Sequence, residues 1–190
     1  MTAPTHAADT PPVSCIGIIL DGNRRWAKAK GLPSFEGHAE GVKRLREVVR
    51  WARDARIPHM IAYAFSTENW RRSKEEVGYL VKLFRSVLES ETNKMVDERI
   101  RVRFVGERSR FSEDIQGAMT AMEAATAESY DITLHLAMSY GGRAEIVAAA
   151  NALLQEHATG VTEEAFTKKL WSHPMPDPDL IIRTGGEKRL

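Results

Sequence analysis

Short apolar runs alternate along this chain with longer segments in which apolar residues recur at helical spacing. The first run, Cys15–Leu20, reads CIGIIL, and a continuous apolar run of this length is typical of a strand buried on both faces of a parallel sheet. The same pattern predicts further strands at His59–Phe65, Ile100–Gly106, Ile132–Met138 and Asp179–Arg183. Helices are predicted between them at Val42–Ala55, Ser73–Leu88, Ser112–Ser129, Ala144–Glu156 and Thr162–Trp171. This alternation predicts an α/β fold with a central, mostly parallel sheet flanked by helices.

Length and cysteine content limit the organisation of the chain. A chain of 190 residues corresponds to about one domain, and we expect a disordered tail over residues 1–14 and one domain over residues 15–190. The tail has neither the basic start nor the apolar core of a secretory signal, and no apolar run reaches the ~20 residues of a membrane span. The single cysteine excludes a disulfide framework and a multi-cysteine metal site. These features predict a cytoplasmic protein in which Cys15 is a buried thiol rather than a nucleophile.

A near-neutral total charge hides a segregation of basic and acidic residues. Residues 21–74 hold 13 basic and 6 acidic side chains, a net charge of +7, whereas residues 75–190 hold 14 basic and 19 acidic side chains, a net charge of −5. A basic third within a neutral protein indicates an anionic ligand that is held locally. Solvated helix faces are the alternative interpretation of this pattern.

Polar and glycine-rich segments directly follow four of the predicted strands. They read DGNRRW at residues 21–26, STENWRR at residues 66–72, SYGGR at residues 139–143 and RTGGEKR at residues 183–189. Because the carboxyl ends of parallel strands meet along one edge of the sheet, we expect all four loops to line one crevice. Glycine backbones and arginine forks suit a diphosphate. A divalent cation such as Mg²⁺ between Asp21 and the phosphate oxygens would relieve their mutual repulsion.

These residues also have structural interpretations. Asp21 is alternatively a turn residue, and Trp26 and Trp70 are alternatively core residues. His38 is alternatively a lone histidine near a helix start. The chain has no Walker loop, no G-x-G-x-x-G and no nucleophile elbow. A phosphohydrolase would require a second carboxylate two residues after Asp21, but Asn23 stands there. The arginines lie in strand-end loops rather than along one face of the protein, so we expect no nucleic-acid partner.

Five stretches of the sequence resemble the cis-prenyltransferase family, of the undecaprenyl diphosphate synthase type. They are IILDGNRRWAKAKG, the pair Gly37-His38, YAFSTENWRR, SYGGR and DPDLIIRTGGEKRL, and their order and spacing match from Ile18 to the C-terminus. The resemblance implies a central parallel sheet with surrounding helices, and a homodimer. It also implies an isoprenyl transferase that condenses isopentenyl diphosphate with an allylic, farnesyl-type diphosphate in successive cis additions. The polyprenyl diphosphate product is expected to be the lipid carrier precursor for cell-wall synthesis.

The resemblance also assigns roles to individual residues. Asp21 becomes the essential carboxylate, which works with Mg²⁺ at the allylic diphosphate, and Asn69 becomes a residue implicated in proton removal. Since asparagine is a poor base, we hypothesise that Asn69 orients a water molecule or a diphosphate oxygen that takes the proton. The positions implied at the allylic diphosphate are Gly22, Asn23, Arg24, Arg25 and His38. Those implied to line the substrate site are Trp26, Ser66, Thr67, Glu68, Trp70 and Arg72, and those implied to grip isopentenyl diphosphate are Arg183 and Arg189.

A growing isoprenoid chain would require an apolar tunnel. Each added five-carbon unit would gain roughly 4 kcal/mol on burial, at ~0.8 kcal/mol per CH₂ group. The predicted helix over residues 77–88 and the strand Ile132–Met138 supply candidate walls, with Met138 and Ala64 as wall positions and plain core packing as the alternative. A tunnel of fixed depth would set the product length. The product is a membrane lipid, so peripheral contact with a membrane is expected through the product, although the sequence contains no anchoring segment.

Two departures from the family pattern have consequences. Residues 32–36 read LPSFE where relatives often carry a basic residue, so one diphosphate contact is expected to be absent or supplied elsewhere. The chain stops at Leu190 where relatives continue with an acidic Mg²⁺ ligand, so we expect the domain to lack its C-terminal end and the turnover of these 190 residues to be weak or absent. A non-catalytic partner subunit of a cis-prenyltransferase complex is the alternative function, against which the retained Asp21, Asn69 and Arg25 argue.

Overall fold

The computed structural model describes residues 13–157 and 160–187, so residues 1–12 of the expected tail lie outside it. The strands are β1 (Cys15–Ile19), β2 (His59–Ser66), β3 (Ile100–Val105), β4 (Ile132–Tyr140) and β5 (Leu180–Arg183). The α-helices are α1 (Asn23–Ala29), α2 (Ser34–Asp54), α3 (Lys74–Asp97), α4 (Glu113–Ala125), α5 (Gly142–Gln155) and α6 (Glu163–Thr167). Each predicted strand is present within one or two residues of its predicted bounds.

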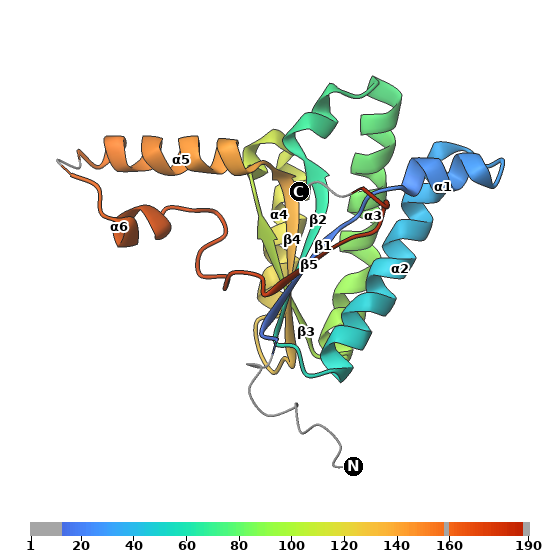
Figure 1. The fold of residues 1–190 in the computed structure, drawn as a ribbon, viewed down its shortest axis with the longest axis horizontal. Coiled ribbons are helices and arrows are strands. Elements are labelled where there is room, and N and C mark those ends of the chain that lie inside the picture. The colour runs from blue at the N-terminus through green and yellow to red at the C-terminus, as the bar shows by residue number, and fades with distance from the viewer. Residues whose placement is uncertain (1–12, 158–159, 188–190) are drawn as a thin grey trace, which may run out of the picture.

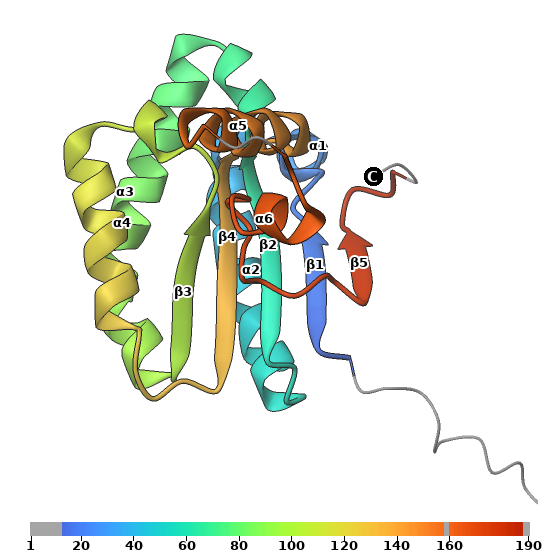
Figure 2. The same ribbon diagram turned by 90° about the vertical axis from the view of Figure 1, so that its left-hand side faces the viewer.

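The strands form one sheet in the order β3-β4-β2-β1-β5. Every pairing between these strands is parallel, which confirms the predicted α/β architecture. The carboxyl ends of the strands therefore lie at one edge of the sheet, the upper edge in Figure 2. Because β1 lies between β2 and β5, the loops that follow these three strands are neighbours at that edge.

The helices divide between the two faces of the sheet. α1, α2 and α3 lie on one side, whereas α5 and α6 extend away on the other (Figure 1). On the first side, α2 buries Val49 and Ala52 against Met60 of β2, and α3 buries Phe84 and Leu88 in a second cluster that continues to α4. Burial of these apolar side chains anchors the long helices to the sheet.

The main differences from the sequence prediction are α1, for which no range was predicted, and the ends of several helices, such as α3, which continues to Asp97 rather than ending at Leu88. Helix α2 begins at Ser34, well before the predicted start at Val42, and it therefore contains His38. Residues 34–41 read SFEGHAEG, which has little apolar periodicity, and this segment is helical because it packs on α1. Helix α6 ends at Thr167 rather than near Trp171.

Candidate active site

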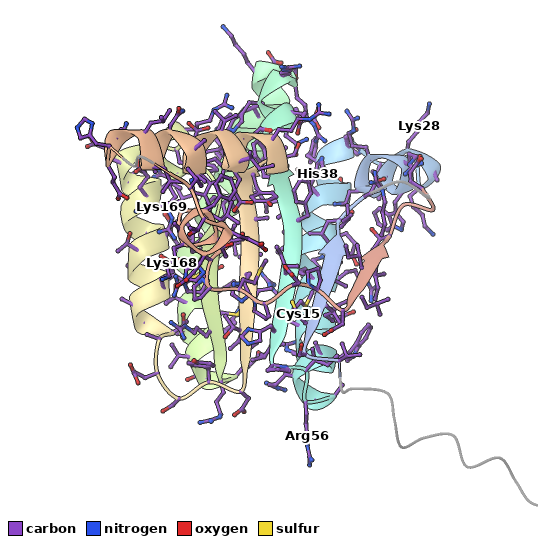
Figure 3. All side chains as sticks on the ribbon, turned by 60° about the vertical axis from the view of Figure 1, so that its left-hand side comes forward. Cys15, Lys28, His38, Arg56, Lys168 and Lys169 are labelled. Carbon is purple, nitrogen blue, oxygen red and sulfur yellow. The ribbon has the colours of Figure 1, made fainter. Side chains whose placement is uncertain are left out.

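A polar cavity of about 290 Å³ opens at the carboxyl ends of β1 and β2. Its lining residues are Leu20, Asp21, Gly22, Asn23, Arg24, Arg25, His38, Ala64, Asn69, Arg72, Leu80 and Glu187. Figure 3 shows His38 at this end of the sheet, whereas Cys15 lies toward the opposite end of β1. The structure thus gathers in one cavity every residue that the resemblance assigned to the allylic diphosphate, together with both residues expected to be catalytic.

Asp21 follows β1 and faces two arginines from distant parts of the chain. Arg183, at the end of β5, donates from Nε and Nη2 to Asp21 Oδ2 over 3.1 and 2.9 Å, and Arg25 Nη2 lies 3.4 Å from the same oxygen. The Thr184 hydroxyl donates to the Asp21 carbonyl oxygen over 2.7 Å and accepts from the Asp21 N–H over 3.1 Å. Burial alone would raise the pKa of Asp21, but hydrogen bonds from Arg183 and a backbone N–H, with the charge of Arg25, lower it. Asp21 is therefore ionised at neutral pH.

The loop after β5 can close over Asp21 because Gly185 has no side chain. A Cβ atom at Gly185 would lie 2.6 Å from both Asp21 Oδ2 and Arg25 Nη2, which is closer than van der Waals contact allows. The absence of that atom lets Arg25 donate from Nη2 to the Gly185 carbonyl oxygen over 3.0 Å, while its Nη1 donates to Glu187 Oε1 over 3.0 Å. This glycine therefore permits the Asp21–Arg25–Arg183 cluster to form.

A second charged cluster centres on Glu76, at the start of α3, and its partners Arg24, His38 and Arg72 line the cavity. Its carboxylate accepts a hydrogen bond from Arg72 Nη1 over 2.7 Å and lies 3.6 Å from both Arg24 Nη1 and His38 Nε2. Burial and the nearby charge of Arg72 lower the pKa of His38, so its ring is neutral at neutral pH. The Glu76 N–H also donates to Ser73 Oγ over 3.2 Å, and Ser73 thereby caps the start of α3.

Asn69 is held by the 3-10 helix Thr67–Arg71, which follows β2. Its Oδ1 accepts a hydrogen bond from the Ser66 N–H over 3.1 Å, and the Ser66 side chain accepts from the Asn69 N–H, so the two residues form a capping box. Because a backbone N–H is always a donor, this contact determines which way the amide group is turned. The Asn69 Nδ2 group has no hydrogen-bond partner in the described part of the chain and is available to donate to a ligand.

An apolar cavity of about 120 Å³ adjoins the polar cavity between α2, α3 and the sheet. The residues common to both cavities are Leu20, Asn23, His38, Ala64 and Leu80. Ala64 and Met138, the expected wall positions, both line the apolar cavity, together with Leu83 and Val87 of α3. A further apolar cavity of about 50 Å³ lies deeper between the same helices. A hydrocarbon chain attached to an anion in the polar cavity therefore has an apolar space next to it.

Several residues expected to line the substrate site lie outside the wall of the polar cavity. Trp70 packs against Phe65 with ring centroids 5.0 Å apart, and its Nε1 donates to Ser139 Oγ over 2.9 Å, so its core interpretation describes its packing. Trp26 is 43% exposed on α1. The others are Ser66, Thr67 and Glu68, which lie at the start of the turn that holds Asn69. Arg189 lies outside the described residues.

The expectation that all four strand-end loops line one crevice is wrong for the loop after β4. Residues 139–143 are absent from the cavity wall, because β2 separates β4 from β1 in the sheet. This loop instead contacts β2 and the turn that follows β2. The Tyr63 hydroxyl of β2 donates to the Tyr140 carbonyl oxygen over 3.1 Å, and Ser139 accepts the bond from Trp70.

Sequence reasoning also missed residues that shape the cavity. Glu187 stands within the RTGGEKR segment, and its position after a strand was the signal that could have identified it. Thr184 was detectable in the same way. Glu76 had no such signal, because it stands inside the predicted helix that begins at Ser73 rather than directly after a strand.

The cavity offers a partial site for a metal ion. No group of three or more His, Cys, Asp or Glu side chains among residues 13–157 and 160–187 could hold a metal by itself. Mg²⁺, however, is usually bound by one or two carboxylates together with substrate phosphates and water. Asp21 provides one ionised carboxylate beside arginines that could hold phosphate oxygens. The donor set therefore fits Mg²⁺ in combination with a diphosphate.

Comparison with known proteins places these features in a family. The prenyltransferase family model that describes undecaprenyl diphosphate synthase matches residues 19–190. The chain is 44% identical over 179 residues to the isoprenyl transferase of Chromobacterium violaceum, with 94% of this chain and 71% of that protein covered. It is 42% identical over 179 residues to the isoprenyl transferase of Thermotoga maritima, with 92% and 77% covered.

A solved structure agrees with these sequence matches. The crystal structure of lavandulyl diphosphate synthase from Lavandula x intermedia, in complex with dimethylallyl diphosphate, superposes with a TM-score of 0.87 at 32% sequence identity. The match covers 94% of this chain and 80% of that chain. The arrangement of the parallel sheet and its helices is therefore shared with a prenyl diphosphate synthase.

Proposed function

This chain belongs to the undecaprenyl diphosphate synthase family, and from that premise we propose that it condenses isopentenyl diphosphate with an allylic diphosphate in successive cis additions. Membership makes the chain a prenyl-transferring enzyme, and the non-catalytic partner subunit has no finding in its favour. The observation that carries the proposal is the Asp21–Arg25–Arg183 cluster beside an apolar cavity. An allylic diphosphate has the same two parts, an anionic headgroup and a hydrocarbon tail.

The proposed reaction begins with cleavage of the allylic C–O bond, which leaves carbocation character on the prenyl group. Fixed donors that stabilise the departing diphosphate lower this barrier, and Arg25 and the backbone after Asp21 are placed to act in this way. Bound Mg²⁺ would supply further charge neutralisation at the diphosphate, held by Asp21. Arg183 adjoins Asp21 and is the proposed contact to the second diphosphate, with Arg189 as its partner in the role that the resemblance implies.

Asn69 is proposed to act as a hydrogen-bond donor. Its Oδ1 already accepts a hydrogen bond from the Ser66 N–H, and an amide is too weak a base to take up the proton that is lost after the condensation step. The Nδ2 group can instead hold a diphosphate oxygen in the position to take that proton. This refines the expectation from sequence, in which either a water molecule or a diphosphate oxygen was the acceptor.

The apolar cavity is proposed to receive the growing chain. Each five-carbon unit that enters would gain roughly 4 kcal/mol by leaving water, which favours repeated addition until the space is filled. Ala64 lies where the polar and apolar cavities meet, and Met138 lines the apolar cavity. The wall at these positions is proposed to influence the length of the polyprenyl product.

We extend the proposal to a cytoplasmic homodimer. Large apolar side chains are exposed on α5, where Ile146, Val147 and Leu154 are 53%, 58% and 70% exposed, and on β5, where Leu180 is 49% exposed. Exposed apolar surface of this kind marks a site of protein contact. No helix in the described part of the chain is both long and apolar enough to cross a bilayer. Cys15, the single cysteine, is a buried thiol, which suits a reducing compartment.

The proposal is tested by incorporation of radiolabelled isopentenyl diphosphate. Purified full-length protein should extend farnesyl diphosphate into a cis-linked, extractable product when Mg²⁺ is present, without any partner protein. Chelation of the metal and Asp21→Asn should each abolish incorporation. Asp54→Asn, which removes an equivalent charge from an exposed position of α2, should leave it unchanged. Absence of incorporation by the wild-type protein, or a product with trans geometry, would contradict the proposal.

A further inference from the structure

A second pocket, of about 130 Å³ and lined by both polar and apolar side chains, lies on the face of the sheet opposite α2 and α3. It is enclosed between strands β2, β3 and β4 and residues 171–174, in the segment that Figure 2 shows crossing this face after α6. The enclosing segment is tethered, because the Ser172 N–H donates to the buried carboxylate of Glu145 over 2.7 Å. Contacts within the protein therefore hold this wall of the pocket in place.

The strand register places basic side chains side by side in this pocket. Arg101 of β3 pairs with Thr133 of β4, which pairs in turn with His59 of β2, and the next inward row holds Arg103 and His135. Since alternate residues of a strand point to opposite faces, all five side chains lie on the face away from α2 and α3. Strands of parallel sheets are usually apolar on both faces. The polar character of this face therefore requires another explanation.

The positive groups of the pocket have aromatic rather than acidic neighbours, since the Arg101 guanidinium lies 4.9 Å from the centroid of the Tyr130 ring. No acidic side chain lines the pocket among the described residues. The carboxylate of Glu123 lies 3.9 Å from Arg103 Nε but already accepts two short hydrogen bonds from Arg108. Arg101 Nη1 donates to the Tyr130 hydroxyl over 2.8 Å, yet the buried Nε of Arg101 has no hydrogen-bond partner. A buried donor without a partner costs free energy unless a ligand or water accepts from it.

Two histidines complete the pocket. His135 is 7% exposed, and its Nε2 lies 3.4 Å from His59 Nδ1. Burial, His59 and the charges of Arg103 and Arg101 lower the pKa of His135 to about 4, so its ring is neutral at neutral pH. A neutral imidazole still carries one N–H donor. Arginine forks and imidazole N–H groups converging on an enclosed space are typical of an oxyanion site.

We propose that this pocket binds a phosphate-type anion, at a site separate from the polar cavity around Asp21. The two sites are on opposite faces of the sheet, since the catalytic cavity is walled by α1, α2 and α3. At about 30 Å³ per water molecule, the volume corresponds to several waters, which is enough space for phosphate. The anion would be free phosphate, the diphosphate that prenyl transfer releases, or the headgroup of a prenyl diphosphate, which share the same chemistry.

The proposal is tested by NMR of the histidine ring C–H signals during titration with inorganic phosphate. The signals of His59 and His135 report the second pocket, and that of His38 reports the catalytic cavity, so binding at the two sites is separated in one experiment. We expect saturable shifts of both His59 and His135. Parallel titrations with diphosphate and with isopentenyl diphosphate identify which anion binds most tightly.

Variants decide whether the arginines form the site. Arg101→Gln and Arg103→Gln should each weaken phosphate binding at His135 about tenfold or more, because hydrogen bonds to charged groups are strong. Arg44→Gln removes the same charge from an exposed position on α2 and should have no effect on it. Preserved chemical shifts of the other residues show that a variant is folded. If only one of the two arginine variants folds, that variant alone is enough for the test. Unchanged His59 and His135 signals at phosphate concentrations that saturate His38, or wild-type affinity in the folded arginine variants, would overturn the proposal.

Discussion

Acidification should destabilise this protein through one buried histidine. The pKa of His135 is lowered from its ordinary value of 6.5 to about 4 in the folded state. Between these two values the unfolded chain binds a proton that the folded chain does not, so the free energy of unfolding decreases as the pH falls. The slope is about 1.4 kcal/mol per pH unit. From about pH 7.5 to about pH 5, His135 alone should therefore remove about 2 kcal/mol of stability.

Urea unfolding of the wild-type protein and of His135→Gln, followed at several pH values, measures this contribution. The variant should lose about 2 kcal/mol less than the wild type over the same pH range, whatever its stability at neutral pH. His59 remains in the variant and is also kept neutral, since burial and Arg101 lower its pKa, so some pH dependence should persist. Protein concentration must be constant, and the buffers must be free of phosphate because a bound anion would add stability.

A matched variant separates burial from the mere presence of a histidine. His157 is exposed after the end of α5, so His157→Gln should keep the wild-type pH dependence. If His135→Gln instead showed the same slope as the wild type, His135 would titrate as a solvated side chain. That result would refute both its burial and the enclosed character of the pocket around it.

Three further predictions concern the polar cavity around Asp21 and its surroundings. A Cβ atom at Gly37 would overlap the Asn23 carbonyl oxygen, so Gly37→Ala should lower the free energy of unfolding in urea by about 1–3 kcal/mol and weaken diphosphate binding. A Cβ atom at Gly78 would meet nothing within 4 Å, so Gly78→Ala should raise the free energy of unfolding by about 0.5–1 kcal/mol. Equal effects of the two substitutions would contradict the proposed packing of α1 on α2. Asn69→Asp keeps the oxygen that accepts from the Ser66 N–H but loses the Nδ2 donor. Its turnover should therefore fall as strongly as that of Asn69→Ala, while the allylic diphosphate still binds. Near-normal turnover of Asn69→Asp would exclude the donor role. Ala64→Leu should shorten the products separated by chromatography, whereas Ala124→Leu on the exposed surface of α4 should leave their length unchanged. An unchanged product length in Ala64→Leu would contradict the proposal that Ala64 lines the tunnel.

The strands were predictable because each depends on a local pattern. The side chains of a continuous apolar run such as Cys15–Leu20 are removed from water only when both faces of the strand are buried in a sheet. The polar residues directly after the run mark the end of the strand. The beginning of α2 was not predictable in this way. Residues 34–41 have no apolar stripe, and their helix depends on contact with α1, where Gly37 lies against the Asn23 carbonyl group.

The candidate site was likewise predictable from the sequence only in part. Asp21, Asn69 and the arginines were identifiable from their positions after strands and from the family motifs. The role of Glu76 was not, because its partners Arg24, His38 and Arg72 come together only when α1, α2 and α3 pack. The orientation of the Asn69 amide likewise depends on a turn whose geometry no residue pattern specifies.

By itself, the sequence determined the alternation of strands and helices, the chemistry placed at each strand end, and the family. These properties depend on backbone periodicity and on residues close together in the chain. Only the tertiary structure decided which strand-end loops meet, since the order β3-β4-β2-β1-β5 brings the loop after β5 to Asp21 and leaves the loop after β4 outside the cavity. It also decided that Arg101, Arg103, His59 and His135 face one enclosed pocket. The physical reason is that strand order and register join residues far apart in the chain, and these are set by the packing of the whole sheet rather than by any local pattern.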